Sequence, residues 1–168
     1  MRFIVVYSSV TGNTKAVAEA VYECLPMPKE IYPVESAPDP GPYDVIALGF
    51  WLDRGTADER TRRYIQRIQN KYVGIFGTSG VYPDSDHARE ALRRVEALLE
   101  GNHLLGSVMC QGRVDTAFAE KLGEIAPASR EVSPIDRDPV AAARSHPDAS
   151  DLKNVQTAFR AMLKKITG

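Results

Sequence analysis

Short apolar runs that alternate with helical segments constrain the fold of this chain more than any other feature. The runs are rich in branched aliphatic and aromatic residues, and they cover residues 3–7, 44–50, 72–78 and 104–111. Strands that are apolar on both faces are typical of parallel sheets, whose two faces are covered by helices. The alternation therefore predicts an α/β fold in which right-handed helical crossovers join parallel strands.

Apolar residues recur with helical spacing between these runs. The predicted stripes are Val17, Ala20, Val21, Cys24 and Leu25; Tyr64, Ile65 and Ile68; Ala88, Ala91, Leu92, Val95, Leu98 and Leu99; and Leu152, Val155, Phe159, Met162 and Ile166. Residues 56–59 (TADE) have the pattern of a capping box for the second helix, with Thr56 as its N-cap. Asp148 or Ser150 is the expected cap of the last helix, and weaker helical patterns cover residues 117–125 and 140–144.

A fifth, weaker strand is predicted at residues 30–34, and it contains Pro33. Proline cannot donate a hydrogen bond to a neighbouring strand, so this strand belongs at a sheet edge. The strand order 2-1-3-4-5 places it there, whereas the 3-2-1 order of a truncated Rossmann sheet would make it interior. We therefore expect one domain over residues 1–168, with a five-stranded parallel sheet of order 2-1-3-4-5 and helices on both faces.

Composition excludes several classes of protein. The chain has 22 acidic and 21 basic residues, so its charge gives no reason to expect nucleic acid or an anionic membrane as a partner. Two cysteines, Cys24 and Cys110, are too few for a metal site or a disulfide framework. The absence of a charged-then-apolar leader at the start leads us to expect a cytoplasmic location.

The expected topology predicts where a ligand binds. In open α/β sheets the site lies beyond the carboxyl ends of the strands, at the switch point between strands 1 and 3. The loops that meet there are residues 8–14, 51–56 and 77–83.

The first of these loops is suited to a phosphate group. Ser9, Thr11 and Thr14 surround Gly12, between a buried strand and the start of a helix. Hydroxyl groups, backbone N–H groups and the positive end of a helix dipole together bind a phosphate dianion. Because the loop has neither the lysine of a Walker loop nor a GxGxxG pattern, it suits a small monophosphate. The alternative is a simple turn whose hydroxyl side chains cap the helix.

The pattern Ser9-x-Thr11-Gly12-x-Thr14 resembles the [ST]-x-T-G-x-T phosphate loop of flavodoxins and lies in the same place, directly after strand 1. The resemblance extends over about residues 1–112 and implies a flavodoxin-like three-layer sandwich that binds FMN. It implies that the FMN phosphate is held by Ser9, Thr11, Gly12, Asn13 and Thr14, and that Ser8 and Val10 also belong to the cofactor-binding residues.

The resemblance also implies that the isoalloxazine ring lies between the other two loops. Aromatic side chains commonly flank the ring in flavodoxins, and the candidates here are Trp51 and Tyr82; the alternatives are a core residue and a surface turn residue. The remaining residues implied at the ring are Phe50, Leu52, Asp53, Arg54, Gly55, Thr56, Thr78, Ser79, Gly80 and Pro83.

Arg54 and Gly55 are neighbours in the second of the three loops. The resemblance implies that the Gly55 peptide accepts a hydrogen bond from N5 of the reduced ring, and a plain turn glycine is the alternative. Arg54 departs from the acidic surroundings typical of low-potential flavodoxins, since a cation near the ring favours its anionic reduced form.

Three further stretches of the sequence restrict the resemblance to one subgroup of the family. They are residues 49–59, 77–85 and 110–112. They are similar to a subgroup of short flavodoxin-like proteins of anaerobic bacteria, one branch of which is associated with bilirubin reduction. This implies a monomeric electron carrier between redox protein partners, a reductase donor and an acceptor enzyme, for which a tetrapyrrole reductase is one candidate. The alternative is an FMN-dependent NAD(P)H reductase of quinones or similar small molecules. A response regulator is disfavoured because Phe50 and Ser8 stand where it needs acidic residues.

No catalytic or metal-binding residue is expected. Cys110 is interpreted as a buried structural thiol, and His146 as a local hydrogen-bonding residue at the entrance to the last helix. Arginines in the second helix form either a solvated face or a docking site for an acidic partner, while Asp84 and Asp86 could serve a basic one. The arginines are Arg60, Arg62, Arg63 and Arg67.

Overall fold

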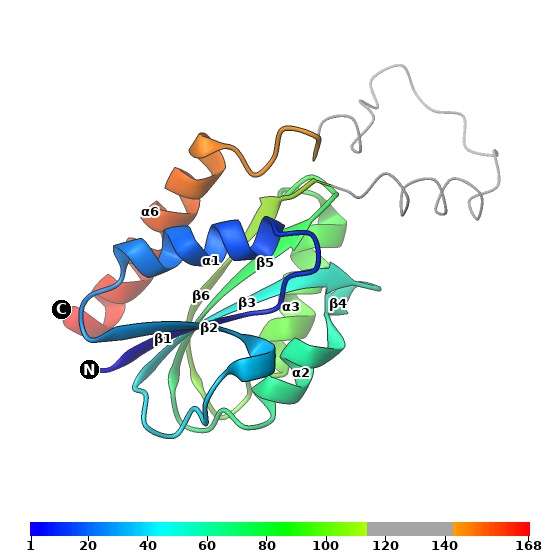
Figure 1. Ribbon diagram of the computed structural model, residues 1–168. Coiled ribbons are helices and arrows are strands. Elements are labelled where there is room, and N and C mark those ends of the chain that lie inside the picture. The colour runs from blue at the N-terminus through cyan, green and yellow to red at the C-terminus, as the bar shows by residue number, and fades with distance from the viewer. Residues whose placement is uncertain (114–142) are drawn as a thin grey trace, which may run out of the picture.

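A computed structural model describes residues 1–113 and 143–168 and shows a parallel sheet between two layers of helices (Figure 1). The strands are β1 (Phe3–Tyr7), β2 (Lys29–Pro33), β3 (Val45–Asp53), β4 (Thr56–Ala57), β5 (Tyr72–Ser79) and β6 (His103–Gln111). The order is β2-β1-β3-β5-β6, all parallel, and β4 pairs antiparallel with β3. The five long strands therefore have the predicted order 2-1-3-4-5, and the three-layer fold is confirmed.

The edge position of β2 agrees with its proline. Pro33 is exposed and lies opposite Tyr7 in the last rung of the pairing with β1. The strand ends there, one residue earlier than predicted, because Val34 begins a short 3₁₀ helix, η1 (Val34–Ser36). A strand that contains proline is therefore tolerated at this edge, where no further strand needs its N–H groups.

Each face of the sheet carries its own core. Helices α1 (Asn13–Cys24) and α6 (Ala149–Thr167) pack together on one face, and α2 (Glu59–Ile65) and α3 (Asp86–Ala97) cover the other (Figure 1). Alternate residues of β1 serve the two cores, because Phe3 and Val5 face α1 and α6, whereas Ile4 and Val6 face the other side. This alternation explains why β1 is apolar along its whole length.

Two aromatic side chains, one from β3 and one from β5, each pack against a glycine of the other strand. Gly49 lies opposite Phe76, and Phe50 lies opposite Gly77. A Cβ atom on Gly49 would stand 2.2 Å from the Phe76 ring, and one on Gly77 would stand 2.6 Å from the Phe50 ring. Both rings are fully buried, so each glycine provides the space that the opposite ring fills.

Two expectations about the segment after residue 50 are wrong. Residues 51–56 are not a plain loop, because β3 continues to Asp53 and turns back into β4. Arg54 and Gly55 form the two-residue turn with φ angles of 51° and 80°, the backbone signs of a type I′ hairpin. Thr56 pairs with Asp53 and is therefore not the N-cap of α2, as the capping-box pattern predicted. Asp58 has that position and accepts a hydrogen bond from the Thr61 N–H at 3.1 Å.

The other helices follow the predicted stripes, with differences at their ends. Helix α2 ends at Ile65, although Ile68 remains buried in the core beyond it. Asp148 is the N-cap of α6, in agreement with one of the two predicted residues. The helical patterns at residues 117–125 and 140–142 lie outside the described residues. Within the described ranges, no helix combines the length and apolar character that a membrane span requires.

The helix cap at Asp58 contributes to the stability of the protein. We expect Asp58→Ala to lower the free energy of unfolding by about 1–2 kcal/mol, because the buried carboxylate accepts hydrogen bonds from both the N–H and the hydroxyl of Thr61. Thr56→Ala is the matched control and should cost less than half as much. Urea unfolding measures both variants, and a larger loss for Thr56→Ala would restore the capping-box interpretation.

Candidate functional site

Residues 8–14, which we call the phosphate loop, join the end of β1 to the start of α1. The Ser8 N–H donates to the Gly49 carbonyl at 3.0 Å, which continues the pairing of β1 with β3 by one residue. Gly12 has a φ of 91°, which a left-handed turn requires, and its N–H donates to Ser9 Oγ at 3.2 Å. The loop therefore leaves the sheet at a fixed point and turns directly into α1.

The start of α1 is not capped by its own side chains. The N-cap residue is Gly12, which makes no side-chain capping bond, and no acidic residue stands in the first turn. The first N–H groups of the helix are thus available to an anion, and the helix dipole favours one there. This observation weighs against the simple capping turn considered from the sequence.

One hydroxyl in the phosphate loop is buried and has no hydrogen-bond partner in the part of the chain that the structure describes. Ser8 is fully buried, and its Oγ makes no hydrogen bond with any residue that the structure describes. A buried hydroxyl in that state is unfavourable unless a ligand supplies the bond. Thr14 is also buried, and its hydroxyl shares a 2.7 Å hydrogen bond with that of Thr78 at the end of β5. The loop thus combines an unsatisfied donor with a firm link to the neighbouring strand.

The segment after β6 closes one side of the phosphate loop. Asn13 Nδ2 donates to the Arg113 carbonyl at 2.6 Å and to Thr11 Oγ1 at 3.2 Å. A Cβ on Gly112 would stand 2.8 Å from Asn13 Nδ2, so the two segments are in close contact. Sequence reasoning did not include Arg113 in the site, because nothing local links it to a loop 100 residues away.

Trp51 and the hairpin turn form the next part of the edge. Trp51 is half-buried, pairs with Thr78 of β5, and accepts a hydrogen bond from the Asp58 N–H at 3.2 Å. Arg54 is exposed at the turn, whereas Gly55 is buried and its carbonyl accepts a 3.3 Å hydrogen bond from Arg94. The remaining predicted residues differ in exposure: Phe50 lies in the core, and Leu52, Asp53 and Thr56 are half-buried.

The loop after β5 completes the edge. Ser79 Oγ accepts from the Val81 N–H at 3.2 Å, and the Gly80 carbonyl accepts from Gln111 Nε2 at 3.4 Å. Tyr82 and Pro83 are half-buried in the same loop. Of the predicted site residues, Val10, Thr11, Gly12 and Arg54 are the exposed ones. The three predicted segments therefore meet at one end of the sheet, as the topology requires.

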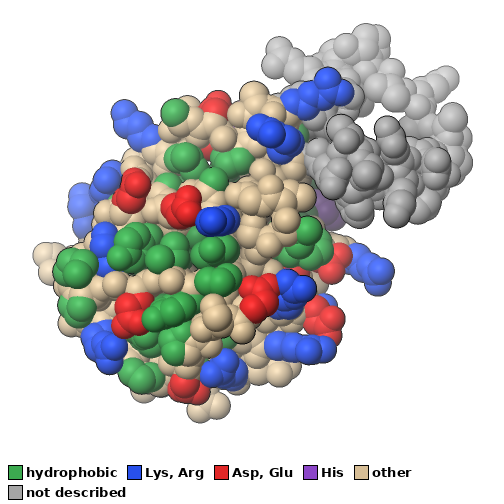
Figure 2. All heavy atoms as spheres, in the orientation of Figure 1, with side chains coloured by type: hydrophobic (Ala, Val, Ile, Leu, Met, Phe, Trp, Pro, Cys, Tyr) green, Lys and Arg blue, Asp and Glu red, His purple; other side chains and the backbone are tan. Residues whose placement is uncertain are grey.

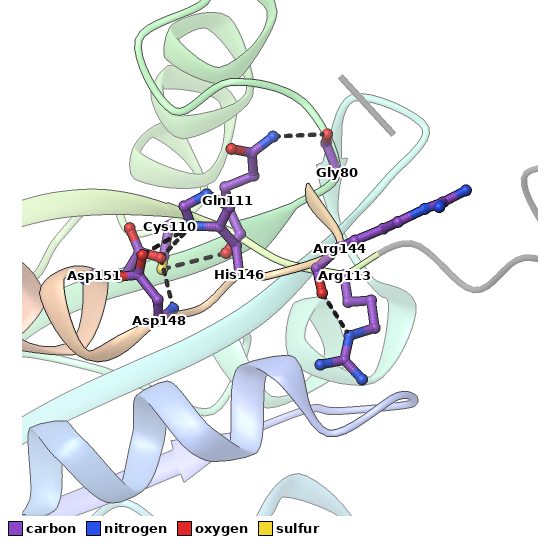
Figure 3. A network of polar contacts seen from close by, with 8 residues as sticks. All are labelled: Gly80, Cys110, Gln111, Arg113, Arg144, His146, Asp148 and Asp151. Atoms are coloured by element: carbon purple, nitrogen blue, oxygen red, sulfur yellow. Dashed lines mark hydrogen bonds and ion pairs between the residues drawn. The ribbon is translucent and has the colours of Figure 1, made fainter. Parts of the chain in front are cut away.

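Cys110 and the start of α6 form a polar network beside this edge (Figure 3). Cys110 is buried, and burial, assisted by Asp151 and Asp148, raises the pKa of its thiol to about 12. His146 Nδ1 lies 2.5 Å from Asp151 Oδ2, which makes it the expected hydrogen-bonding residue. His146, Asp148 and Asp151 place possible metal ligands within 4.8 Å of one another, but both carboxylates serve the capping box of α6. We therefore interpret this network as structural.

The raised pKa of the Cys110 thiol should make it slow to react. A thiol is alkylated through its thiolate, so Cys110 should react with iodoacetamide at pH 8 at least about tenfold more slowly than the half-buried Cys24. Mass spectrometry of the folded protein measures the two rates, and Cys24→Ser isolates the Cys110 signal. Both thiols should react alike in denaturant. Fast labelling of Cys110 in the folded protein would contradict the structural interpretation.

Fold and site together define an α/β protein with an anion-binding loop at the carboxyl edge of a parallel sheet. A family model described as "Flavodoxin domain" matches residues 4–160. The chain belongs to the flavodoxin family, which confirms the family that the Ser9–Thr14 motif indicated. It is thus a flavodoxin-like redox protein, and FMN is the cofactor of that family.

One relative and two solved structures are consistent with the assignment to the flavodoxin family. A flavodoxin-like domain-containing protein, BilS, from Clostridioides difficile (strain CD3) is 29% identical over 98% of each chain. Oxidised flavodoxin 1 from Bacillus cereus has a TM-score of 0.59 at 15% identity, over 99% of both chains. A flavoprotein from Lactobacillus acidophilus NCFM, solved in complex with FMN, has a TM-score of 0.54 at 14% identity, over 73% of this chain and 98% of that one. At these identities the solved structures support the fold.

Proposed function

We propose that this chain binds FMN non-covalently and passes electrons between a reductase and an acceptor enzyme. The observation that carries the proposal is the phosphate loop, in which a buried hydroxyl without a partner among the described residues stands beside an uncapped helix start. Ser8, Ser9, Thr11, Asn13 and Thr14 would hold the FMN phosphate. A structurally similar protein that contains FMN supports this choice of cofactor. Bound FMN supplies electron transfer in steps of one or two electrons.

The residues proposed at the ring have distinct tasks. Trp51 and Tyr82 lie on adjacent segments and offer aromatic surfaces against which a flat ring stacks. The buried hydroxyl pair of Thr14 and Thr78 holds the phosphate loop against β5, so both ends of a bound FMN would contact segments that are joined to each other. The hairpin turn at Arg54 and Gly55 forms the third side.

The chemistry of the residues at this edge supports the hypothesis of an electron carrier. The phosphate loop offers hydroxyl and amide groups, and the Cys110 thiol is held protonated by its raised pKa. Transfer of electrons between proteins needs no general base, whereas it does need an exposed approach to the cofactor. Acidic and basic side chains are interspersed on the face of the molecule that Figure 2 shows.

We propose a tetrapyrrole reductase as the acceptor, on the resemblance of three sequence stretches to the branch associated with bilirubin reduction. The second candidate function is an NAD(P)H-dependent reductase of quinones, and Arg54 favours it. An exposed guanidinium at the rim stabilises a fully reduced, anionic ring and therefore favours two-electron chemistry. The two functions differ in the source and the number of electrons accepted in each step.

The buried hydroxyl of Ser8 should contribute to FMN binding. We expect Ser8→Ala to weaken FMN binding by about tenfold, because it removes a buried donor to the phosphate. The same change should not lower the free energy of unfolding of the protein without FMN, since the hydroxyl has no partner among the described residues. Fluorescence titration with FMN and urea unfolding measure the two effects. A loss of stability with unchanged FMN affinity would contradict this assignment.

The two candidate functions differ in how the bound FMN is reduced. The carrier proposal predicts that bound FMN is reduced by dithionite in two resolved one-electron steps, and that NAD(P)H alone does not reduce it. Anaerobic titration followed by visible spectroscopy tests both statements. Direct reduction by NAD(P)H with turnover of a quinone would establish the reductase instead. Failure of the protein to bind FMN at any concentration would exclude both functions.

A further inference from the structure

The phosphate loop contains no cation, which leaves most of the charge of a phosphate dianion to be balanced from elsewhere. Residues 8–14 are neutral. Lys15, the next residue, is exposed and pairs with Glu19 on the same helix at 3.9 Å. Neutral hydrogen bonds and the helix dipole stabilise an anion, but bonds from a cation are about twice as strong. A cation held beside the loop would therefore contribute strongly to binding.

Arg113 is held beside the loop by its backbone. The Gly112 N–H donates to the Ser79 carbonyl at 2.8 Å, which fixes the end of β6 against β5. The next carbonyl, that of Arg113, accepts the 2.6 Å hydrogen bond from Asn13 Nδ2, and Asn13 is the first residue of α1. The Arg113 main chain thus contacts the end of α1 at which an anion is expected.

The side chain of Arg113 is oriented as well. Its Nε donates to the Arg144 carbonyl at 3.1 Å, an anchor that leaves the fork of the guanidinium directed away from that bond. In Figure 3 the guanidinium of Arg113 points toward the end of α1 next to the phosphate loop, whereas the Arg144 side chain extends in the opposite direction. Arg113 is exposed, so a ligand can reach the group without a rearrangement of the core.

We propose that the Arg113 guanidinium binds the phosphate group of FMN and supplies the positive charge that the phosphate loop lacks. This inference rests on the proposed function and adds a binding residue to it. The planar fork of an arginine matches two phosphate oxygens at once, which a lysine cannot do. Asn13 would then act on both sides, because it contributes to the loop and holds the Arg113 main chain in place.

Arg113 has a competing structural explanation, which the experiment must separate. Its bond to the Arg144 carbonyl joins two parts of the chain that are 31 residues apart, so its loss could loosen the site in general. A general loosening would weaken every flavin equally. Loss of a phosphate ligand would weaken FMN but leave riboflavin, which has the same ring and no phosphate, unaffected.

The test compares Arg113→Gln with the wild type by fluorescence titration with FMN and with riboflavin. We expect FMN affinity to fall by about tenfold, riboflavin affinity to stay unchanged, and the salt dependence of FMN binding to become weaker. Arg113→Lys keeps the charge without the fork and should lose less. Arg144→Gln is the matched control, because it leaves the carbonyl that Arg113 contacts and should change neither affinity.

Inorganic phosphate provides a second measurement that does not need the ring. We expect phosphate to raise the Tm of the protein without FMN, relative to sodium chloride at equal ionic strength, and expect Arg113→Gln to reduce that rise. Equal losses for FMN and riboflavin, unchanged FMN affinity, or a phosphate effect that Arg113→Gln fully retains would each overturn the proposal. If the wild type itself fails to bind FMN, the proposed function fails first, and that result is distinct from a failure of Arg113.

Discussion

The parallel pairing of β1 with its two neighbours sets the position of each segment in the proposed site. All but the last residue of β1 are buried, and every rung is matched on one side by β2 and on the other by β3. Because the Ser8 N–H continues that pairing to Gly49, the phosphate loop starts from a point that cannot shift without breaking the sheet. The link between Thr14 and Thr78 then ties the start of α1 to β5. The phosphate loop is therefore attached to the sheet at both of its ends.

The sequence predicts those parts of the structure that depend on neighbours in the chain. The apolar run of β1, the hydroxyl-rich loop after it and the proline in β2 each identify their own structure and together lead to the strand order. Thr56 shows the limit, since its capping pattern is genuine but pairing with Asp53 takes the residue into a strand, and Asp58 becomes the cap. The position of Arg113 cannot be predicted from the sequence, because its place beside Asn13 follows from the packing of β6 against β5 and not from any local pattern.

The arginines near the proposed site come from segments other than the phosphate loop. The loop itself is neutral, while Arg54 comes from the hairpin after β3 and Arg113 from the end of β6. The whole chain carries a formal charge of only −1, so the field at the cofactor would be set by these local cations. In the proposed site, neutral donors would give shape to the binding site, and arginines contributed by more distant segments would give it charge. The two properties can therefore change independently.

The reciprocal packing of Gly49 with Phe76 and of Phe50 with Gly77 has a consequence for how this fold diverges among relatives. A larger residue at either glycine collides with a ring that is itself enclosed, so no single substitution at these positions is accommodated easily. A smaller residue in place of the ring would create the necessary space, but alone it leaves a cavity. We therefore expect the residues at positions 49 and 76 to change together during evolution. The same holds for the residues at positions 50 and 77.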